Sequence, residues 1–600
     1  MCGLIGVAGG IAAPQRRAAL QALAPRGPDG SAEAELGGVW MGHTLLALRD
    51  TPERSQQPMH SRCGRVALLF NGEIYNVQAL RHRLDGALPA PRTSTDTELV
   101  LDLFMAGGVD ALAELQGIYA LAVVDARGAV PDITLLRDPL GVKPLLHAHR
   151  GGRFAFASTA TALLAAGMAR PLLDRQAVAH YLQFGSFAEP DTPLADVRAL
   201  EPGWCLQWRD GQVSSRRLCP LRARHDTAAD PTQRLADLMQ AAVDAQLADQ
   251  PDAHLMLSGG VDSALLAHFT AARRPQARSY TLAFESARAF LDETAEAEAT
   301  ATRAGLIHTR LESRAGDIHD WFRHFIAALD QPTLDGANVY VFMRALPRDI
   351  RVLLNGTGPD ELLFGYPWVW DILDTHRGRV SLGRTALAKA WMQRCTLCAA
   401  GEVGPLLGLP PKAVHRGALR ALRAVDPGPS QPLAERLQRI VLRRFTADRL
   451  LRDLDACAMA FGVEVRVPLL DTSLTEHALG ESEESLAQTW PVAPSPSLSY
   501  AESPLKRRMV QVANGRVSPA LLTRSGKRGF VAPYDEWLRG PLMPIVSREM
   551  SVSALREVGW HDPTLAHRFA YRELTAQQRS LTFWLLLVLQ SWARHHRIFF

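Results

Sequence analysis

The stretch Leu255-Met256-Leu257-Ser258-Gly259-Gly260-Val261-Asp262-Ser263 decides the fold of the second half of this chain. Its apolar residues predict a strand. The Ser-Gly-Gly that follows predicts a sharp turn, in which glycine lets a phosphate approach bare backbone. The next residues predict a helix, so that backbone N–H groups and the positive end of the helix dipole face the turn. The turn is therefore expected to hold an anion, and pyrophosphate is the expected one.

Two common nucleotide motifs do not fit this stretch, because it lacks both the Walker lysine and the G-x-G-x-x-G spacing. Residues 258–263, SGGVDS, instead resemble the pyrophosphate loop of the N-type ATP pyrophosphatases. Those enzymes cleave ATP between the α and β phosphates and form an acyl-adenylate. The resemblance implies that ATP is a substrate, bound by Leu257, Ser258, Gly259, Gly260, Asp262 and Ser263.

Composition narrows the class of protein. The 600 residues are too many for one hydrophobic core, so two or more domains are expected. The 66 basic and 62 acidic residues nearly balance, so the charge does not indicate binding to nucleic acid, and a small molecule or a peptide is the expected partner. Seven scattered cysteines do not form a disulfide framework, and no signal peptide or membrane span is expected, since the most apolar segment, 581–592, is too short. A cytoplasmic location is expected.

The N-terminus places a thiol in an apolar strand. Removing Met1 would give Cys2 both a nucleophilic sulfur and a free α-amine that could act as its base. Further on, Asn71-Gly72-Glu73 follows a strand, and Asp96 lies in the first turn of a helix that begins near Ser94. Together these residues resemble the glutaminase domain of class II glutamine amidotransferases, an N-terminal-nucleophile α-β-β-α sandwich. It is expected to cover residues 1–219, with a linker at 220–232.

The resemblance implies a role for each of these residues. The Cys2 thiolate would attack the amide of glutamine, and Asn71 and Gly72 would form the oxyanion hole. Such donors are commonly worth about 3 kcal/mol each. Glu73 and Asp96 would hold the α-amine of glutamine.

One position departs from that family's pattern. The family's G-H-x-R-L-S-I-x-D has its arginine, which grips the glutamine carboxylate, where this chain has Leu45. Arg49 lies on the same face of an extended strand but about 13 Å further along, too far to replace it without a bulge. Losing the clamp should weaken glutamine binding by a few kcal/mol. A feeble or vestigial glutaminase is expected.

The second half, residues 233–600, alternates strands and helices, which predicts a doubly wound parallel sheet with ligands at the carboxyl ends of its strands. After the strand 352–354, residues 355–366 read NGTGPDELLFGY and resemble the S-G-[ED]-G-x-D-E-x-F-G-G-Y loop of the asparagine synthetases. The resemblance adds Gly356 to the ATP site. Asp262 and Asp360 are the expected Mg²⁺ ligands, because a hard cation that bridges phosphates takes few protein oxygens. Glu361 would support them.

The acceptor half of the site carries a second departure. Thr357 stands where asparagine-forming members have the acid thought to manage the proton of ammonia. Glu464, within a stretch that matches M-A-x-x-x-E-x-R-x-P-x-L-D, is the candidate acid of the acceptor site. Lys506 is the candidate for steadying transition-state charge, just upstream of Lys527-Arg528-Gly529-Phe530, which matches K-x-G-F.

The resemblance to glutamine-hydrolysing asparagine synthetases implies an ATP-dependent amide-bond synthetase. In one interpretation glutamine supplies ammonia, as the intact Cys2 site favours. In the other, an amine of the substrate closes a ring, as in relatives that make β-lactams or lasso-peptide macrolactams, and a protease and a precursor peptide would be partners. Leu45 and Thr357 favour this second interpretation. A catalytically dead scaffold is disfavoured by the paired carboxylates and phosphate glycines, and a homodimer is compatible with both enzyme interpretations.

Overall fold

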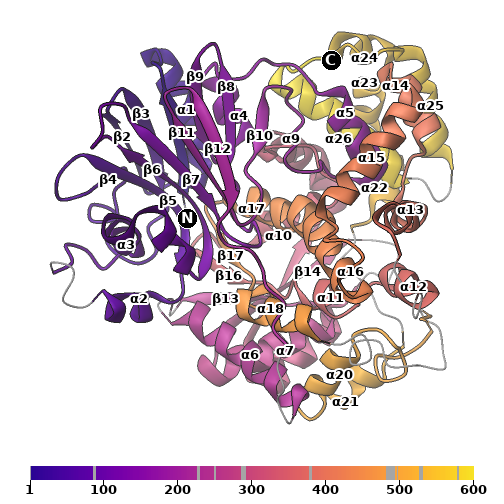
Figure 1. The fold of residues 1–600 in the computed structure, drawn as a ribbon. Coiled ribbons are helices and arrows are strands. Elements are labelled where there is room, and N and C mark those ends of the chain that lie inside the picture. Colours follow the sequence, from indigo (N-terminus) through magenta and orange to yellow (C-terminus); the bar gives the residue numbers. More distant parts are fainter. Residues whose placement is uncertain are drawn as a thin grey trace.

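The protein is described here by a computed structural model, which covers residues 2–84, 90–225, 230–248, 250, 252–285, 292–376, 382–481, 494–495, 497–525, 532–576 and 580–600. Its first half contains two six-stranded antiparallel sheets (Figure 1). The first sheet has the order β10-β8-β9-β1-β3-β2 and the second β12-β11-β7-β6-β5-β4. The strands are β1 (Cys2–Ala8), β2 (Gly30–Leu36), β3 (Val39–Leu45), β4 (Met59–His60), β5 (Val66–Ile74), β6 (Gly117–Asp125), β7 (Asp132–Arg137), β8 (Leu146–Arg150), β9 (Arg153–Ala157), β10 (Val197–Ala199), β11 (Trp204–Arg209) and β12 (Gln212–Arg217).

The two sheets pack face to face because each turns a row of apolar side chains inward. Leu4 and Met41 of the first sheet share one buried cluster with Leu69 and Ala122 of the second. Helices α1 and α4 contact the first sheet, and α3, with α2 beside it, contacts the second. The predicted α-β-β-α sandwich is confirmed. The helices of this half are α1 (Ala13–Leu23), α2 (Val77–Arg83), α3 (Asp96–Ala111), α4 (Ala160–Ala165) and α5 (Arg175–Phe184).

The second half is built on a five-stranded sheet in which every pair is parallel. The chain starts at the central strand, moves out along one side, and returns to the other side, which gives the order β15-β14-β13-β16-β17. This confirms the predicted doubly wound sheet, and its switch point lies between β13 and β16. The strands are β13 (Ala253–Met256), β14 (Arg278–Phe284), β15 (Ile307–Ser313), β16 (Val352–Leu354) and β17 (Glu464–Arg466).

Helices cover this sheet on both sides. In Figure 1, α6 and α7 lie below the strands and α10 and α17 above them. The helices of this half are α6 (Pro231–Leu247), α7 (Val261–Arg273), α8 (Thr294–Ala304), α9 (Ile318–Ala328), α10 (Gly336–Ala345), α11 (Pro359–Leu362), α12 (Pro367–His376), α13 (Arg384–Cys395), α14 (Ala400–Leu407), α15 (Pro411–Val425), α16 (Leu433–Val441), α17 (Arg452–Met459), α18 (Thr472–Gly480), α20 (Arg507–Ala513), α21 (Pro519–Thr523), α22 (Tyr534–Arg539), α23 (Met543–Glu549), α24 (Val552–Val558), α25 (Pro563–Thr575) and α26 (Ser580–His596).

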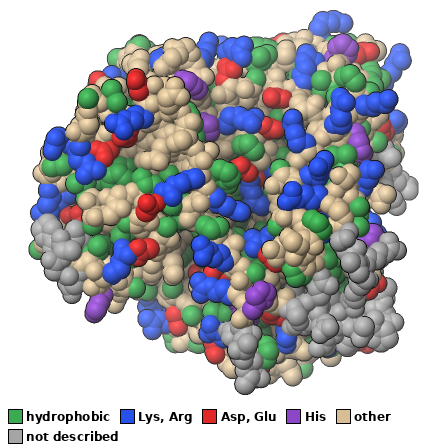
Figure 2. Space-filling model, in the orientation of Figure 1, with side chains coloured by type: hydrophobic (Ala, Val, Ile, Leu, Met, Phe, Trp, Pro, Cys, Tyr) green, Lys and Arg blue, Asp and Glu red, His purple; other side chains and the backbone are tan. Residues whose placement is uncertain are grey.

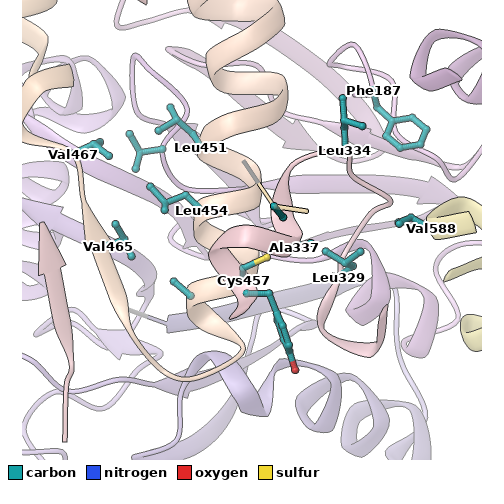
Figure 3. Close-up of a cluster of buried hydrophobic side chains, with 14 of the residues drawn as sticks. Phe187, Leu329, Leu334, Ala337, Leu451, Leu454, Cys457, Val465, Val467 and Val588 are labelled. Carbon is teal, nitrogen blue, oxygen red and sulfur yellow. The ribbon is translucent and has the colours of Figure 1, made fainter. Parts of the chain in front are cut away.

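Helix α17 continues from a π-helical segment, η5 (Leu442–Leu451), and is anchored by its apolar face. Leu451, Leu454 and Cys457 recur at a spacing of three residues, which places them on one face of the helix. Figure 3 shows Leu451 and Leu454 close to Val467 and Val465, and Cys457 close to Ala337. The same buried cluster includes side chains from the first half of the chain. The polar residues of α17 are therefore held in fixed positions between the two halves.

The outer surface mixes charges of both signs. Figure 2 shows basic and acidic side chains interspersed over the visible face. Within the described ranges, no helix has the length and apolar character needed to cross a membrane. The apolar segment 581–592 lies in α26, and all of its side chains except that of Leu581 are buried, as the sequence predicts.

Candidate active sites

The pyrophosphate loop leaves β13 at the switch point and leads into α7, whose N-cap is Gly260. Its conformation is fixed from within by two serines. The Ser263 hydroxyl donates to the carbonyl oxygen of Ser258 at 2.9 Å, and the two hydroxyl oxygens lie 3.0 Å apart. Gly356, in the loop after β16, approaches so closely that a Cβ there would lie 3.3 Å from the backbone nitrogen of Ser263. The two glycine-rich loops thus meet, as the sequence predicts.

The loop already holds an anionic group. The backbone N–H of Gly259 donates to a carboxylate oxygen of Glu293 at 3.2 Å. A carboxylate oxygen and a phosphate oxygen are equivalent acceptors for such an N–H group. The geometry of the loop is therefore compatible with the pyrophosphate that its sequence predicts.

Asp262 and Asp360 come together although they are far apart in the chain. Their carboxylates both pair with the ammonium group of Lys506, which lies 2.7 Å from Asp360 Oδ1. Burial opposes the charge on this lysine, but the two carboxylates raise its pKa well above the ordinary value. Two carboxylates that converge on one cation are a suitable donor set for Mg²⁺.

The backbone around this cluster is shaped to hold it. Lys506 has φ of 52°, in the left-handed region that non-glycine residues rarely adopt. A Cβ at Gly365 would come within 1.8 Å of Asp360 Oδ1 and 2.3 Å of Lys506 Cε, so only glycine leaves room there. Backbone strain of this kind is characteristic of functional sites.

A cavity of about 430 Å³ opens beside these groups. On one side it is lined by the pyrophosphate loop, and on the other by α10, the end of η5 and the start of α17. Of the predicted ATP-site residues, Gly259 alone does not line it. The lining includes Leu257, Ser258, Gly260, Asp262, Ser263, Thr281, Asp335, Gly356, Thr357, Asp360, Glu361, Tyr366, Asp453 and Lys506.

Thr357 lines this cavity but is not placed to act as a base. Its hydroxyl donates to the side-chain oxygen of Asn355 at 2.5 Å, and its backbone N–H donates to the same oxygen at 2.9 Å. The hydroxyl proton is therefore already committed, and a threonine hydroxyl is in any case a poor base near neutral pH.

Glu464 does not lie where the acceptor site was predicted, which corrects that assignment. It is the first residue of β17 and does not line the cavity, whereas ligand loops follow the last residues of parallel strands. Its side chain is fully buried and pairs with Arg466, which also lies 3.3 Å from Glu73. Glu464 therefore belongs to the buried ion-pair network beside the N-terminal site.

Asp453, which was not predicted from the sequence, is a carboxylate of the cavity. It is 7% exposed, it lies in the first turn of α17, and it accepts a hydrogen bond from the Thr333 hydroxyl. Burial raises its pKa to about 7. It also lines a small crevice that extends towards Arg26 in the first half. No motif marks it, because its place depends on the packing of α17 rather than on a local pattern.

The N-terminal site is assembled by two strands from different sheets. The backbone N–H of Cys2 donates to Asn71 Oδ1 at 2.9 Å, and burial raises the pKa of the Cys2 thiol. The amide nitrogen of Asn71 is buried and has no hydrogen-bond partner among the described residues, which suits a donor to an oxyanion. A Cβ at Gly72 would lie 2.1 Å from the carbonyl oxygen of Ile118 in the neighbouring strand.

The acids expected to bind glutamine lie on β5 and at the start of α3, and they already have a cationic partner. Helix α3 begins at Asp96 with Thr95 as its N-cap, and Asp96 accepts from the backbone N–H of Ile74 at 3.0 Å. Arg49 pairs with Glu73, and its Nε lies 3.9 Å from Asp96 Oδ2. The predicted extended strand through residue 49 is wrong, because β3 ends at Leu45 and the chain turns back.

Comparison with known families fits this architecture. A glutamine amidotransferase domain family matches residues 1–219, and the asparagine synthase family matches residues 234–594, more than half of the chain. The chain belongs to the asparagine synthase family. It is therefore an enzyme of the ATP-dependent carbon–nitrogen ligase type, with a glutamine amidotransferase domain. The motif at residues 527–530 lies outside the described residues.

Individual relatives span most of the chain. A putative asparagine synthetase (glutamine-hydrolyzing) of Mycobacterium tuberculosis H37Rv is 28% identical over 90% of this chain and 88% of its own. Asparagine synthetase (glutamine-hydrolyzing) 3 of Bacillus subtilis is 26% identical over 76% of each. Among solved structures, glutamine phosphoribosylpyrophosphate amidotransferase from B. subtilis is 17% identical, with a TM-score of 0.29, over 60% of this chain and 82% of its own.

Proposed function

We propose that residues 233–600 adenylate a carboxylate with ATP and pass the acyl group to an amine, releasing AMP. The observation that carries this proposal is the meeting of the pyrophosphate loop with Asp262, Asp360 and Lys506 at one cavity. The carboxylate oxygen attacks the α-phosphorus of ATP and pyrophosphate leaves. The amine nitrogen then attacks the acyl carbon, and AMP departs with one of the original carboxylate oxygens.

Each group at the cavity has a proposed role in this reaction. The backbone of the pyrophosphate loop and Ser258 hold the leaving pyrophosphate. Asp262 and Asp360 would hold Mg²⁺, which supplies positive charge to neutralise the phosphate oxygens. Lys506 is a permanent cation at the same point and would neutralise further negative charge. Residues 1–219 form the amidotransferase domain in this proposal, with 220–232 as the linker.

Asp453 takes the proton of the attacking amine in this proposal. The other carboxylates that line the cavity are engaged, including Glu293, which accepts from the backbone N–H of Gly259. Asp262 and Asp360 pair with Lys506, and Arg449 pairs with Asp335. Glu361 accepts from the Tyr366 hydroxyl at 2.6 Å and stands next to Asp360. Asp453 accepts its hydrogen bond from the neutral Thr333 hydroxyl, and a carboxyl with a pKa near 7 suits general-base catalysis at neutral pH.

The amine is proposed to come with the substrate rather than from glutamine. Leu45 lies opposite Cys2 in the β1 and β3 pairing, where it offers no charge to a carboxylate. Arg49 pairs with Glu73, and its Nε lies 3.9 Å from Asp96, so both acids already have a cationic partner. These observations favour the ring-closing interpretation, whereas the Cys2, Asn71 and Gly72 arrangement favours glutamine as donor.

Replacing Cys2 by alanine tests the source of the amine. Carboxylate-dependent AMP formation is expected to be the same for Cys2→Ala and the native enzyme, and added glutamine should change neither, because the nucleophile travels with the substrate. The assay measures AMP and product across aspartate, glutamate and peptides that carry both a carboxylate and an amine. Glutamine-stimulated product that disappears in Cys2→Ala, while ammonia-dependent product remains, would instead show an ammonia-using synthetase.

A further inference from the structure

Arg49 is held across the two acids of the N-terminal pocket. Its Nε donates to Glu73, the same atom lies 3.9 Å from Asp96, and its Nη2 donates to the carbonyl oxygen of Ile74 at 3.1 Å. The three side chains are between 4% and 11% exposed. Arg49 is therefore a largely buried residue of the pocket wall, not a surface arginine.

The turn that carries Arg49 is fixed on both sides. Before it, the backbone N–H of Ala47 donates to Asp29 at 2.8 Å. After it, Asp50 accepts from the hydroxyl of Ser94 at 2.8 Å and from its backbone N–H at 3.1 Å. Ser94 lies two residues before Asp96, so these contacts tie the turn to the start of α3. The position of Arg49 over Asp96 follows from these anchors.

The two acids of this pocket already face cations. Arg49 pairs with Glu73 and lies 3.9 Å from Asp96, and Arg466, which also pairs with Glu464, has its Nη2 at 3.3 Å from Glu73. An α-ammonium group placed between the acids would be a third cation at a buried site, and it would have to displace Arg49. Buried like charges repel strongly, because little water is present to screen them.

We propose that Arg49 fills the cation subsite beside Cys2 and is the specificity-determining residue that excludes α-amino amides such as glutamine. The pocket then accepts only small amides that lack an α-ammonium group. This inference rests on the proposed role of Glu73 and Asp96 as the cation subsite. It also explains why Leu45→Arg alone should not restore glutamine binding, since the carboxylate clamp would return while the ammonium subsite stayed filled.

Two electrophiles that differ only in the α-amine test this inference. 6-Diazo-5-oxo-L-norleucine carries the α-ammonium group of glutamine, and 6-diazo-5-oxohexanoic acid lacks it. Each alkylates the thiol at the amide position with loss of N₂, and intact mass measures the rate on chains that begin at Cys2. For the native protein, the rate with the amino reagent should not exceed that with the desamino reagent. Comparing two reagents on one protein separates specificity from a general loss of structure.

The variants give the expected pattern. Arg49→Gln should raise the rate with the amino reagent about 10- to 100-fold and leave the other rate nearly unchanged, since an ion-paired ammonium contributes roughly that factor. Leu45→Arg alone should raise the rate with the amino reagent only slightly. The double variant should raise this rate by more than the two single variants combined, because the two subsites bind one ligand. Arg49→Lys, which keeps the cation, and Arg54→Gln, an exposed arginine 3.7 Å from Asp50, should behave as the native protein.

Two results would overturn the inference. If Arg49→Gln slows the amino reagent selectively or leaves the ratio of the two rates unchanged, Arg49 does not block the ammonium group. If Arg49→Gln does not fold, the alkylation of Cys2 by iodoacetamide is measured in the native protein with and without glutamine. Protection of Cys2 by glutamine below millimolar concentration would contradict a filled subsite. The absence of protection at millimolar glutamine would support it. Pyrophosphate exchange takes place at the ATP cavity and does not depend on the alkylation of Cys2. A failure of the proposed ligase activity would therefore be distinguished from a failure of this inference.

Discussion

Asp262→Asn is expected to abolish carboxylate-dependent exchange of labelled pyrophosphate into ATP. The substitution removes one of the two carboxylates that converge with Lys506, and with it the charge proposed to hold Mg²⁺ on the phosphates. Asp262 lies in the first turn of α7 and lines the cavity, and Asp360 continues to neutralise Lys506. The melting temperature should therefore change little.

The control for this variant is Asp237→Asn, the same chemical change at an exposed position of α6. It should exchange at the native rate. Undiminished exchange in Asp262→Asn would show that the cavity does not hold the metal and pyrophosphate in the proposed way. A large fall in melting temperature without loss of exchange would assign Asp262 a structural role instead.

Asp453→Asn is expected to lower amide formation by about 100-fold or more while pyrophosphate exchange persists, in keeping with the usual size of general-base effects. The amide side chain keeps the size of the carboxyl group but cannot take a proton. Because only the ionised carboxylate acts as a base, and burial raises the pKa of Asp453 to about 7, the native rate should rise as the pH increases through that value. This inflection should be absent from the variant.

Two further variants separate a base from a merely structural group. Asp453→Glu keeps a carboxylate and should recover part of the activity together with the inflection. Asp335→Asn alters another carboxylate of the same cavity, one that Arg449 already engages, and should cost much less in turnover. A native pH profile in Asp453→Asn would rule out Asp453 as the proton acceptor.

Local sequence predicted the features that depend on short stretches of chain. The turn at Ser258, the strand before it and the start of α3 near Ser94 follow from residue types at fixed spacing, and the structure has them. The doubly wound parallel sheet also followed, because strands alternate with helices along this half of the chain.

The contacts that could not be predicted join segments that are far apart in the sequence. Lys506 meets Asp262 across 244 positions of sequence, and no spacing rule anticipates this. Arg49 was expected on an extended strand, but its anchors at Asp29 and Ser94 turn the chain back. Glu464 was assigned from a motif alone, although a residue that begins a parallel strand lies at the end of the sheet away from the ligand loops.

The fate of the carboxylate oxygens shows directly whether the carboxylate is activated as an adenylate. With a substrate labelled with oxygen-18 in its carboxylate, adenylation and displacement by the amine should deliver one labelled oxygen to AMP for each amide formed. Mass spectrometry of the recovered AMP measures this transfer. Labelled oxygen in inorganic phosphate, with ADP as the nucleotide product, would contradict the account, because it would show activation as an acyl phosphate.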